Sequence, residues 1–310
     1  MSIQNKELEI IEFDRPGTKG KNDMGRNRYP VRGMSPDGRR AYGGSVSRRQ
    51  SGRFRKKERR RQRNIHIFLA LLAMIFLLLL ARAVTLFVGL YMFPSETEEF
   101  LKEQEGNEAY PEKLLELLDK NEETLEFVKD YPNRKKYMGK TIDLSNEVSA
   151  GEVPLLLQWD RRWGYDSYGE GMIALEGCGP TCLSMAYIFL TGDAEMNPRK
   201  MAEFAWEHGY YSPEGTSWSL WTEGASALGL SGEELPLGES NIKQMLDLGG
   251  VVVCSMRPGD FTTTGHFILI RGYDEKGFFV NDPNRKSNSE KQWDFETLKG
   301  QIKNLWGISR

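Results

Sequence analysis

The hydrophobic positions of this chain begin with one long apolar stretch at residues 65–93, in which Arg82 is the only Lys, Arg, Asp or Glu. As a helix it would extend about 43 Å at ~1.5 Å per residue, more than the ~30 Å hydrocarbon core of a bilayer. A signal peptide has an apolar core of only ~7–15 residues, so the stretch is too long for one. We therefore predict a single transmembrane anchor at 65–93, with Arg82 near the outer headgroups because its charge is costly at the centre.

Residues 94–152 show shorter helical patterns. Ser95-Glu96-Thr97-Glu98 matches a capping box, and Pro111 precedes an amphipathic run that contains Leu114 and Leu118. Asn121 is a suitable cap for the next short helix. Helices this short are marginally stable alone, so we predict a helical stalk or linker that docks on the domain after it.

From residue 153 onward the pattern is that of a globular domain, and all seven Trp residues lie in this part of the chain. It predicts helices first, then β-strands: helices at 179–191, 197–208, 217–228 and 240–248, and strands at 251–256, 266–273, 277–281 and 304–309. Helices followed by antiparallel strands make an α+β fold, and residues 153–310 are long enough for one domain.

Charge is distributed very unevenly. Residues 1–64 hold 19 Lys and Arg against 7 Asp and Glu, whereas the remainder holds 23 against 37. The first 64 residues also lack periodic apolar positions, so we predict a disordered basic region there. The basic cluster at 53–63 adjoins the apolar stretch, which places the N-terminus in the cytoplasm and the C-terminal half outside it, in a single-pass cell-membrane protein. We expect this cluster to contact anionic lipid headgroups rather than nucleic acid.

Gly177-Cys178-Gly179-Pro180 is the clearest candidate for chemistry. Pro180 suits the first turn of a helix, and the flanking glycines leave the sulfur uncrowded. A helix N-terminus favours thiolate over thiol, which raises the nucleophilicity of Cys178. For a single cysteine, burial in the core is the more frequent role, so a second observation is needed.

That observation is a predicted hairpin at 266–281, with a tight turn at Asp274-Glu275-Lys276-Gly277. His266 begins its first strand and Asp282 follows its second, so antiparallel pairing brings the two together. A thiol, an imidazole and a carboxylate are the parts of a nucleophilic Cys-His-Asp site. Asn281 competes for the third role, and because neighbouring strand residues face opposite sides, only one of the two can reach His266.

Four segments together resemble a known family: Gln158-Trp159-Asp160, Gly177-Cys178-Gly179-Pro180-Thr181, Gly265-His266-Phe267 and Asn281-Asp282-Pro283. They are similar to papain-like cysteine peptidase family 39, which matures bacteriocins by cutting double-glycine leaders, and more closely to its stand-alone bacterial relatives. The resemblance covers about residues 153–310. It implies a papain-like fold, in which a helical half carries the cysteine and an antiparallel sheet carries the histidine.

The resemblance also implies a role for each matching residue. Cys178 is the nucleophile, His266 the base and acid, Asp282 the group that orients His266, and Gln158 an oxyanion donor. From the residues alone, the turn that contains Trp218 and the loop that ends in Thr264 and Gly265 are candidate walls of a substrate cleft. Neither CxxC spacing nor a phosphate-binding glycine motif occurs, so we expect no metal and no cofactor.

The predicted function is a membrane-anchored, extracytoplasmic cysteine peptidase or amide hydrolase. Two alternatives stay open: a catalytically silent module that binds peptides or cell-wall stems, and a thiol acyltransferase that delivers its acyl group to an amine. The residues do not separate these, nor do they choose among secreted peptides, surface proteins and peptidoglycan peptides as substrates. The oligomeric state is equally open.

Overall fold

A computed structural model describes residues 47–92, 94–213 and 215–310, and the side chains of 47–54 and 90–92 are not described. The chain divides into two compact units, Met1–Leu78 and Leu79–Arg310. The long helix α1, Ser47–Met92, contains the boundary between them. All other described elements belong to the second unit.

Helix α1 begins 18 residues before the predicted anchor, so residues 47–64 are helical rather than disordered. These residues are rich in Arg, Lys and Gln, which are good helix formers. The first 46 residues of the predicted disordered region lie outside the described residues. Within α1, Arg55–Gly89 is long and apolar enough to cross a membrane, and its 18-residue apolar window has a mean hydropathy of 2.8. None of the side chains in this apolar window is buried, so α1 is not a core helix.

Short helices follow in the α2–η2 segment, residues 96–136: α2 (Glu96–Glu103), α3 (Glu112–Lys120), η1 (Glu122–Thr124), α4 (Leu125–Lys129) and η2 (Tyr131–Lys136). The predicted capping box is present, because Ser95 accepts from the Glu98 N–H while the Glu98 carboxylate accepts from the Ser95 N–H. Pro111 precedes α3 and the Asn121 side chain caps η1, both as predicted.

The α2–η2 segment docks on the domain that follows it, as expected for helices of this length. Leu114, Leu118 and Phe127 are buried in a hydrophobic cluster with Tyr165 and Ala174 of that domain. Phe127 stacks on Tyr165 with ring centroids 4.2 Å apart, and the Tyr165 hydroxyl donates to the Phe127 carbonyl oxygen at 2.7 Å. The segment is thus part of the same compact unit and is not a free stalk.

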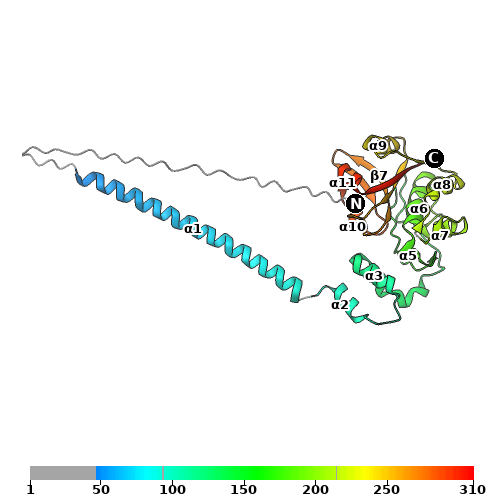
Figure 1. The fold of residues 1–310 in the computed structure, drawn as a ribbon, viewed down its shortest axis with the longest axis horizontal. Coiled ribbons are helices and arrows are strands. Elements are labelled where there is room, and N and C mark those ends of the chain that lie inside the picture. The colour runs from blue at the N-terminus through cyan, green and yellow to red at the C-terminus, as the bar shows by residue number, and fades with distance from the viewer. Residues whose placement is uncertain (1–46, 93, 214) are drawn as a thin grey trace, which may run out of the picture. The chain divides into compact units, whose positions relative to one another are not determined.

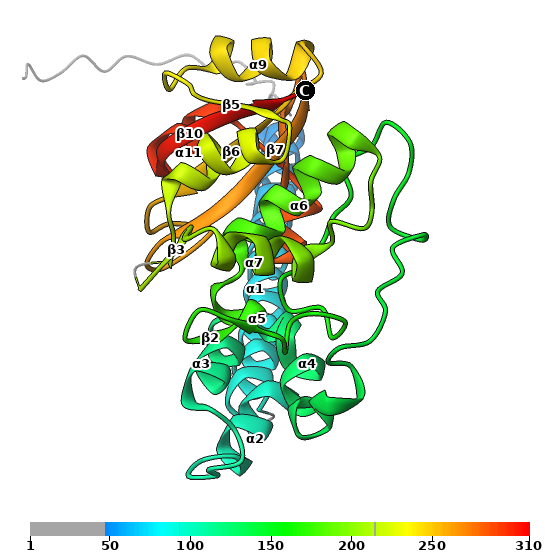
Figure 2. The ribbon, with the colours of Figure 1, turned by 90° about the vertical axis from the view of Figure 1, so that its right-hand side faces the viewer.

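An antiparallel sheet of six strands, in the order β5-β10-β6-β7-β8-β9, forms the centre of the domain (Figures 1 and 2). Its members are β5 (Ser231–Glu234), β6 (Val251–Met256), β7 (His266–Asp274), β8 (Gly277–Asn281), β9 (Gln292–Trp293) and β10 (Ile302–Ser309). The predicted hairpin is correct: Asp274 pairs with Gly277 across a two-residue loop. The short edge strands β5 and β9 escaped prediction because they lack alternating apolar residues.

Helices cover both faces of this sheet, and Figure 1 shows its strands between α11 on one side and α6 and α7 on the other. Strand β6 is buried throughout and contributes side chains to the packing on both faces of the sheet. Val251 and Val253 pack toward α6 (Cys178–Thr191) and α7 (Pro198–Glu207), whereas Val252 and Cys254 pack toward α9 (Glu239–Asp247) and α11 (Phe295–Gln301). The alternation of side chains along a strand explains the two cores.

The remaining elements are short: β1 (Ser167–Tyr168), β2 (Gly171–Met172), α5 (Ile173–Glu176), β3 (Tyr211–Ser212), β4 (Gly215–Thr216), η3 (Trp218–Trp221), α8 (Glu223–Ala227) and α10 (Lys286–Ser289). The prediction of one continuous helix at 217–228 is wrong, because the chain breaks between η3 and α8 at Thr222. Trp221 is fully buried against Phe267 and Trp306, and this anchoring competes with regular helix geometry. The predicted α+β organisation is confirmed.

Candidate active site

Cys178 occupies the first position of α6, directly after the N-cap residue Gly177. Its backbone N–H therefore has no acceptor within the helix and is available to another group. Both neighbouring glycines are required here: a Cβ at Gly177 would approach the Ile173 carbonyl oxygen to 2.6 Å, and one at Gly179 would approach the Thr216 methyl carbon to 2.7 Å. Cys178 is partly exposed, as a nucleophile needs to be.

His266 and Asp282 are joined by a hydrogen bond, with His266 Nε2 and Asp282 Oδ1 2.7 Å apart. His266 is the first residue of β7, and Asp282 follows the last residue of the neighbouring strand β8. Cys178 and His266 line the same cleft, and Cys178 contributes to the raised pKa of the imidazole. The structure therefore brings together the three residues that the sequence singles out, in the order thiol, imidazole and carboxylate.

Asn281 makes different contacts from Asp282. Its Nδ2 donates to the Pro154 carbonyl oxygen at 2.9 Å, and its Oδ1 accepts from Arg271 Nε at 2.9 Å. It faces away from the imidazole, as alternation along the strand requires. The geometry thus decides between the two candidates, and Asp282 is the partner of His266.

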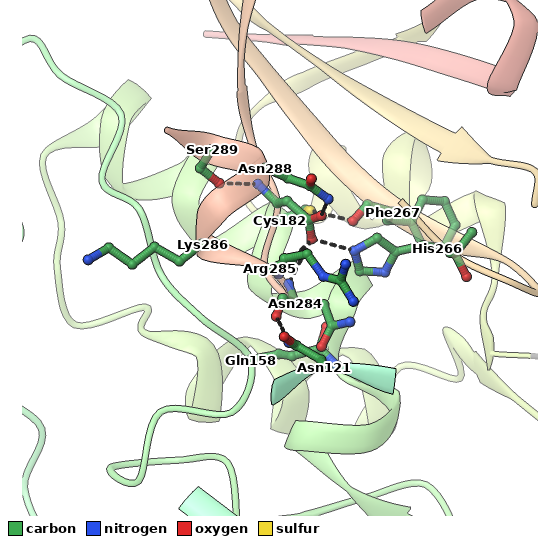
Figure 3. A network of polar contacts seen from close by, with 12 residues as sticks. Asn121, Gln158, Cys182, His266, Phe267, Asn284, Arg285, Lys286, Asn288 and Ser289 are labelled. Carbon is green, nitrogen blue, oxygen red and sulfur yellow. Dashed lines mark hydrogen bonds and ion pairs between the residues drawn. The ribbon is translucent and has the colours of Figure 1, made fainter. Parts of the chain in front are cut away.

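A network of hydrogen bonds holds the Asp282 carboxylate, which is fully buried (Figure 3). Oδ1 also accepts from the backbone N–H groups of Asn284 and Arg285, at 2.8 and 3.1 Å. Oδ2 accepts from Asn288 Nδ2 at 2.8 Å. The Asp282 N–H donates to Ser289 Oγ at 2.9 Å. Both carboxylate oxygens are therefore satisfied, which fixes the direction in which Oδ1 meets His266.

These surroundings perturb both titratable groups of the pair. Burial by itself lowers the pKa of His266, but the negative charge of Asp282, the hydrogen bond that Asp282 accepts from the ring and the neighbouring Cys178 outweigh it and raise that pKa to about 10. Burial alone would raise the pKa of Asp282, whereas the charge and hydrogen bond of His266 and the bond from Asn288 bring it below its usual value. At neutral pH the pair is an imidazolium and a carboxylate.

Gln158 lies at the edge of the same site and is almost completely buried. Its Nε2 donates to the Ala174 carbonyl oxygen at 2.7 Å, and its backbone N–H donates to the Pro283 carbonyl oxygen at 2.7 Å. No described residue donates to its Oε1. The bond to Ala174 orients the side-chain amide, and Nε2 carries a second hydrogen that it can donate.

The site lies in a cleft whose two halves meet at Cys178 and His266. One half has a volume of about 680 Å³ and includes Gln158 and the loop from Gly259 to Gly265. The other half has a volume of about 730 Å³ and includes Trp218 in its wall. Thr264 and Gly265 line both halves, so all three predicted wall residues lie beside the thiol. An extended peptide can pass through such a cleft with one bond over the sulfur.

The other two thiols, those of Cys182 and Cys254, are buried. Burial raises the pKa of both Cys182 and Cys254 above the ordinary thiol value. The Cys182 thiol donates to the Phe267 carbonyl oxygen at 3.5 Å, so it links α6 to β7 one residue beyond His266. Neither thiol lines the cleft, and neither is a second nucleophile.

Sequence reasoning missed Asn288 and Ser289, which hold Asp282 in place. They lie in the four-residue helix α10, which has no recognisable pattern, and Asn288 is fixed in turn because its carbonyl oxygen accepts from Trp293 Nε1 at 2.9 Å. The only available signal was the density of Asn and Ser just after Asp282. Sequence reasoning also missed the contacts that the α2–η2 segment makes with this loop.

Comparison with known proteins agrees with the resemblance. The Peptidase C39-like family matches residues 151–310, about half of the chain. A crystal structure described as a C39-like peptidase from Bacillus anthracis is similar at 16% sequence identity, with a TM-score of 0.33, over 52% of this chain and 96% of that one. No curated protein matches. The family match, which covers α6, β7 and the residues around them, shows that this chain belongs to the Peptidase C39-like family.

Proposed function

We propose that this protein is a membrane-anchored, extracytoplasmic cysteine peptidase that cleaves peptide bonds through Cys178, His266 and Asp282. Membership of a family of C39-like peptidases supports peptidase chemistry in general. The observation that carries the proposal is the hydrogen bond between His266 and the buried Asp282 carboxylate, at the meeting point of the two halves of the cleft, which Cys178 also lines.

In this mechanism His266 already holds the proton of Cys178 before the substrate binds, and the thiolate sulfur attacks the carbonyl carbon of the scissile bond. The backbone N–H of Cys178 and the free hydrogen on Gln158 Nε2 stabilise the oxyanion of the tetrahedral intermediate. His266 then gives its proton to the leaving amine, and a thioester remains on Cys178. Water, deprotonated by His266, attacks the thioester, which releases the acid product and restores the thiolate beside the protonated His266.

Asp282 keeps the imidazole in one orientation and stabilises it when it is charged. The raised pKa of His266 has the same cause, since the buried carboxylate lies 2.7 Å from Nε2. With Nε2 engaged by Asp282, Nδ1 is the ring nitrogen that faces the sulfur. These roles match those that the sequence assigns to the same residues.

The decisive experiment uses full-length protein in lipid nanodiscs and a library of quenched fluorescent peptides and muropeptides. Cys178→Ala is expected to abolish hydrolysis. Cys254→Ala, which removes a buried thiol on the opposite face of the sheet, is the matched control and should retain it. Full activity of Cys178→Ala would refute the proposal. Wild-type protein that binds the peptides without cleaving them would instead indicate a silent binding module.

Acyl transfer is separated from hydrolysis by the product. Mass spectrometry of the reaction with an added amine, such as hydroxylamine or a short peptide with a free N-terminus, shows whether the acyl group ends as a carboxylate or as an amide. We expect the carboxylate to predominate at millimolar amine. Predominant amide formation would refute the assignment as a hydrolase and would favour the thiol acyltransferase.

The proposed topology depends on α1 and its flanks. The described basic residues at 55–63 precede the apolar part of α1, whereas acidic residues start α2. The positive-inside rule then places the N-terminus in the cytoplasm. A membrane-impermeant maleimide should label Cys178 in intact cells, and a cysteine introduced at Ser45 should label only after lysis. The reverse pattern would invert the topology.

A further inference from the structure

The α2–η2 segment contacts the loop that carries Asp282, although it lies outside the family match, which begins at residue 151. Each of the four consecutive residues 284–287 forms a hydrogen bond with one residue in the range 120–123. Asn121 Nδ2 donates to the Asn284 carbonyl oxygen at 2.6 Å, and the Arg285 guanidinium donates to the Lys120 carbonyl oxygen. Figure 3 shows Asn121 directed at Asn284.

Glu123 makes the most directed of these contacts. Its two carboxylate oxygens accept from two successive backbone N–H groups, those of Lys286 at 2.6 Å and Ser287 at 3.0 Å. These are the first two residues of α10. A carboxylate that accepts two backbone N–H groups makes charge-assisted hydrogen bonds, which are stronger than neutral ones and fix direction. Glu123 thereby fixes the start of α10.

The same short loop holds Asp282 from its other side. The Asn284 and Arg285 N–H groups donate to Asp282 Oδ1, and Asn288 of α10 donates to Oδ2. A shift of α10 would therefore move three donors of the carboxylate that orients His266. Glu123 acts on the imidazole through this loop without touching it.

The same segment also supplies one wall of the cleft. On α3, Leu114 and Leu118 are buried in the hydrophobic cluster, and Leu117 packs against its edge. The side chains that line the 680 Å³ half are Lys113, Glu116, Leu117 and Lys120. Their spacing of three and four residues places them on one side of the helix. Lys113 Nζ lies 3.6 Å from Glu176, two residues before Cys178, so the wall reaches the neighbourhood of the thiol.

We propose that α3 and Glu123 are part of the active site, with Glu123 as a positioning residue for the Asp282 loop and the exposed face of α3 as a peptide-binding wall. This inference rests on the proposed function, which supplies the reaction that the loop and the wall serve. It assigns the segment between α1 and the family domain a role in catalysis beyond that of a tether.

The test of the positioning role compares three variants of the full-length protein in nanodiscs. Glu123→Ala removes both acceptors, and Glu123→Gln keeps one acceptor oxygen. Glu122→Ala removes the neighbouring, exposed carboxylate and is the matched control. Misplacement of a catalytic group by about 1 Å costs roughly 100-fold in rate. We expect kcat to fall about 10- to 100-fold in Glu123→Ala and less in Glu123→Gln, with the control unchanged.

Two further measurements separate positioning from a loss of stability. The alkaline limb of the pH–rate profile and the NMR titration of the His266 ring should both move to lower pH in the Glu123 variants. The reason is that the hydrogen bond and ion pair between the imidazolium and Asp282 become weaker. Assays run well below each variant's Tm exclude unfolding. A fall in kcat without any shift in the His266 titration would mean a merely structural role and would overturn the positioning role.

The wall is tested with Leu117→Trp, which narrows one half of the cleft. We expect KM to rise about fivefold or more for peptides that extend into this half, by analogy with the loss of a few apolar contacts. The kcat should be retained, and a short substrate that leaves this half empty should be unaffected. Equal KM values for the long peptides in the variant and the wild type would refute the proposal that this face of α3 binds peptide.

Failure of this inference is distinguishable from failure of the proposed function. Absence of any Cys178-dependent hydrolysis in the wild type would refute the function, and the His266 titration in the Glu123 variants would still decide whether the segment positions the loop. Normal hydrolysis in the wild type and in both Glu123 variants would refute the positioning role and leave the peptidase intact.

Discussion

Replacement of Asp282 by Asn would remove one charge from the buried pair while keeping its shape. In the wild type, Oδ1 accepts from His266, Asn284 and Arg285, and Oδ2 accepts from Asn288. An amide offers one acceptor oxygen and one donor nitrogen. In either orientation the new NH₂ group faces a donor, so at least one buried hydrogen bond is lost.

The structure sets the size of the effect. Loss of one buried hydrogen bond with an unsatisfied donor costs about 1–3 kcal/mol. Removal of one partner from a buried ion pair can cost about 3–5 kcal/mol, but His266 avoids most of this by releasing its proton. For a domain of this size the net loss corresponds to a decrease in Tm of roughly 2–12 °C. The reorientation of His266 should lower kcat roughly 10²- to 10⁴-fold.

The pH dependence gives the sharpest signature. In the wild type the pKa of His266 is raised to about 10, so its contribution to stability is complete below about pH 6.5 and is lost as the pH rises toward 10. In Asp282→Asn, burial remains without the carboxylate and lowers the pKa of His266 below its ordinary value. Stability should then be constant between pH 7 and 10 and be lost as the pH falls below about 6.5.

Thermal unfolding between pH 5 and 10, followed by circular dichroism on the full-length protein, tests these expectations together with peptide hydrolysis. Asn281→Ala is the control, because Asn281 is equally buried and bonds to Pro154 and Arg271 without contacting His266. It should lower the Tm without changing the pH profile. An Asp282→Asn variant that keeps the wild-type slope between pH 7 and 10, or full activity, would refute the reasoning.

The remaining predictions concern packing and access. Gly179→Ala places a Cβ 2.7 Å from the Thr216 methyl carbon, so we expect a loss of about 1–3 kcal/mol and impaired turnover, and unchanged urea unfolding would contradict it. Leu118→Ala opens a cavity beneath the cleft wall and should cost about 2–5 kcal/mol, measured by urea unfolding. Iodoacetamide should modify one thiol per native chain, Cys178, by peptide mapping; reaction of either buried thiol at the same rate would show that the core opens. Trp218→Ala removes a ring that is 42% exposed in the cleft and should raise KM with little change in kcat.

The sequence alone was sufficient for the strongly patterned elements. The helix after Cys178 ends at Gly192, which adopts a left-handed conformation with φ 77°, and strands β6 and β8 have the predicted limits. Local rules determine such features, because a cap, a glycine stop or a tight turn acts within a few residues. The chain order of Cys178, His266 and Asp282 was readable for the same reason: each follows a local signal.

Tertiary structure decided what local rules do not contain. It chose Asp282 over Asn281, since only the twist and pairing of β7 and β8 show which face meets the imidazole. It recruited Asn288 as the second support of that carboxylate, although the sequence between β8 and β9 is without pattern. It also joined Glu123 to Ser287, 164 positions apart. Contacts over such a sequence separation depend on how whole elements pack. The free energy gained by burial stabilises them only after the chain has closed the intervening loops.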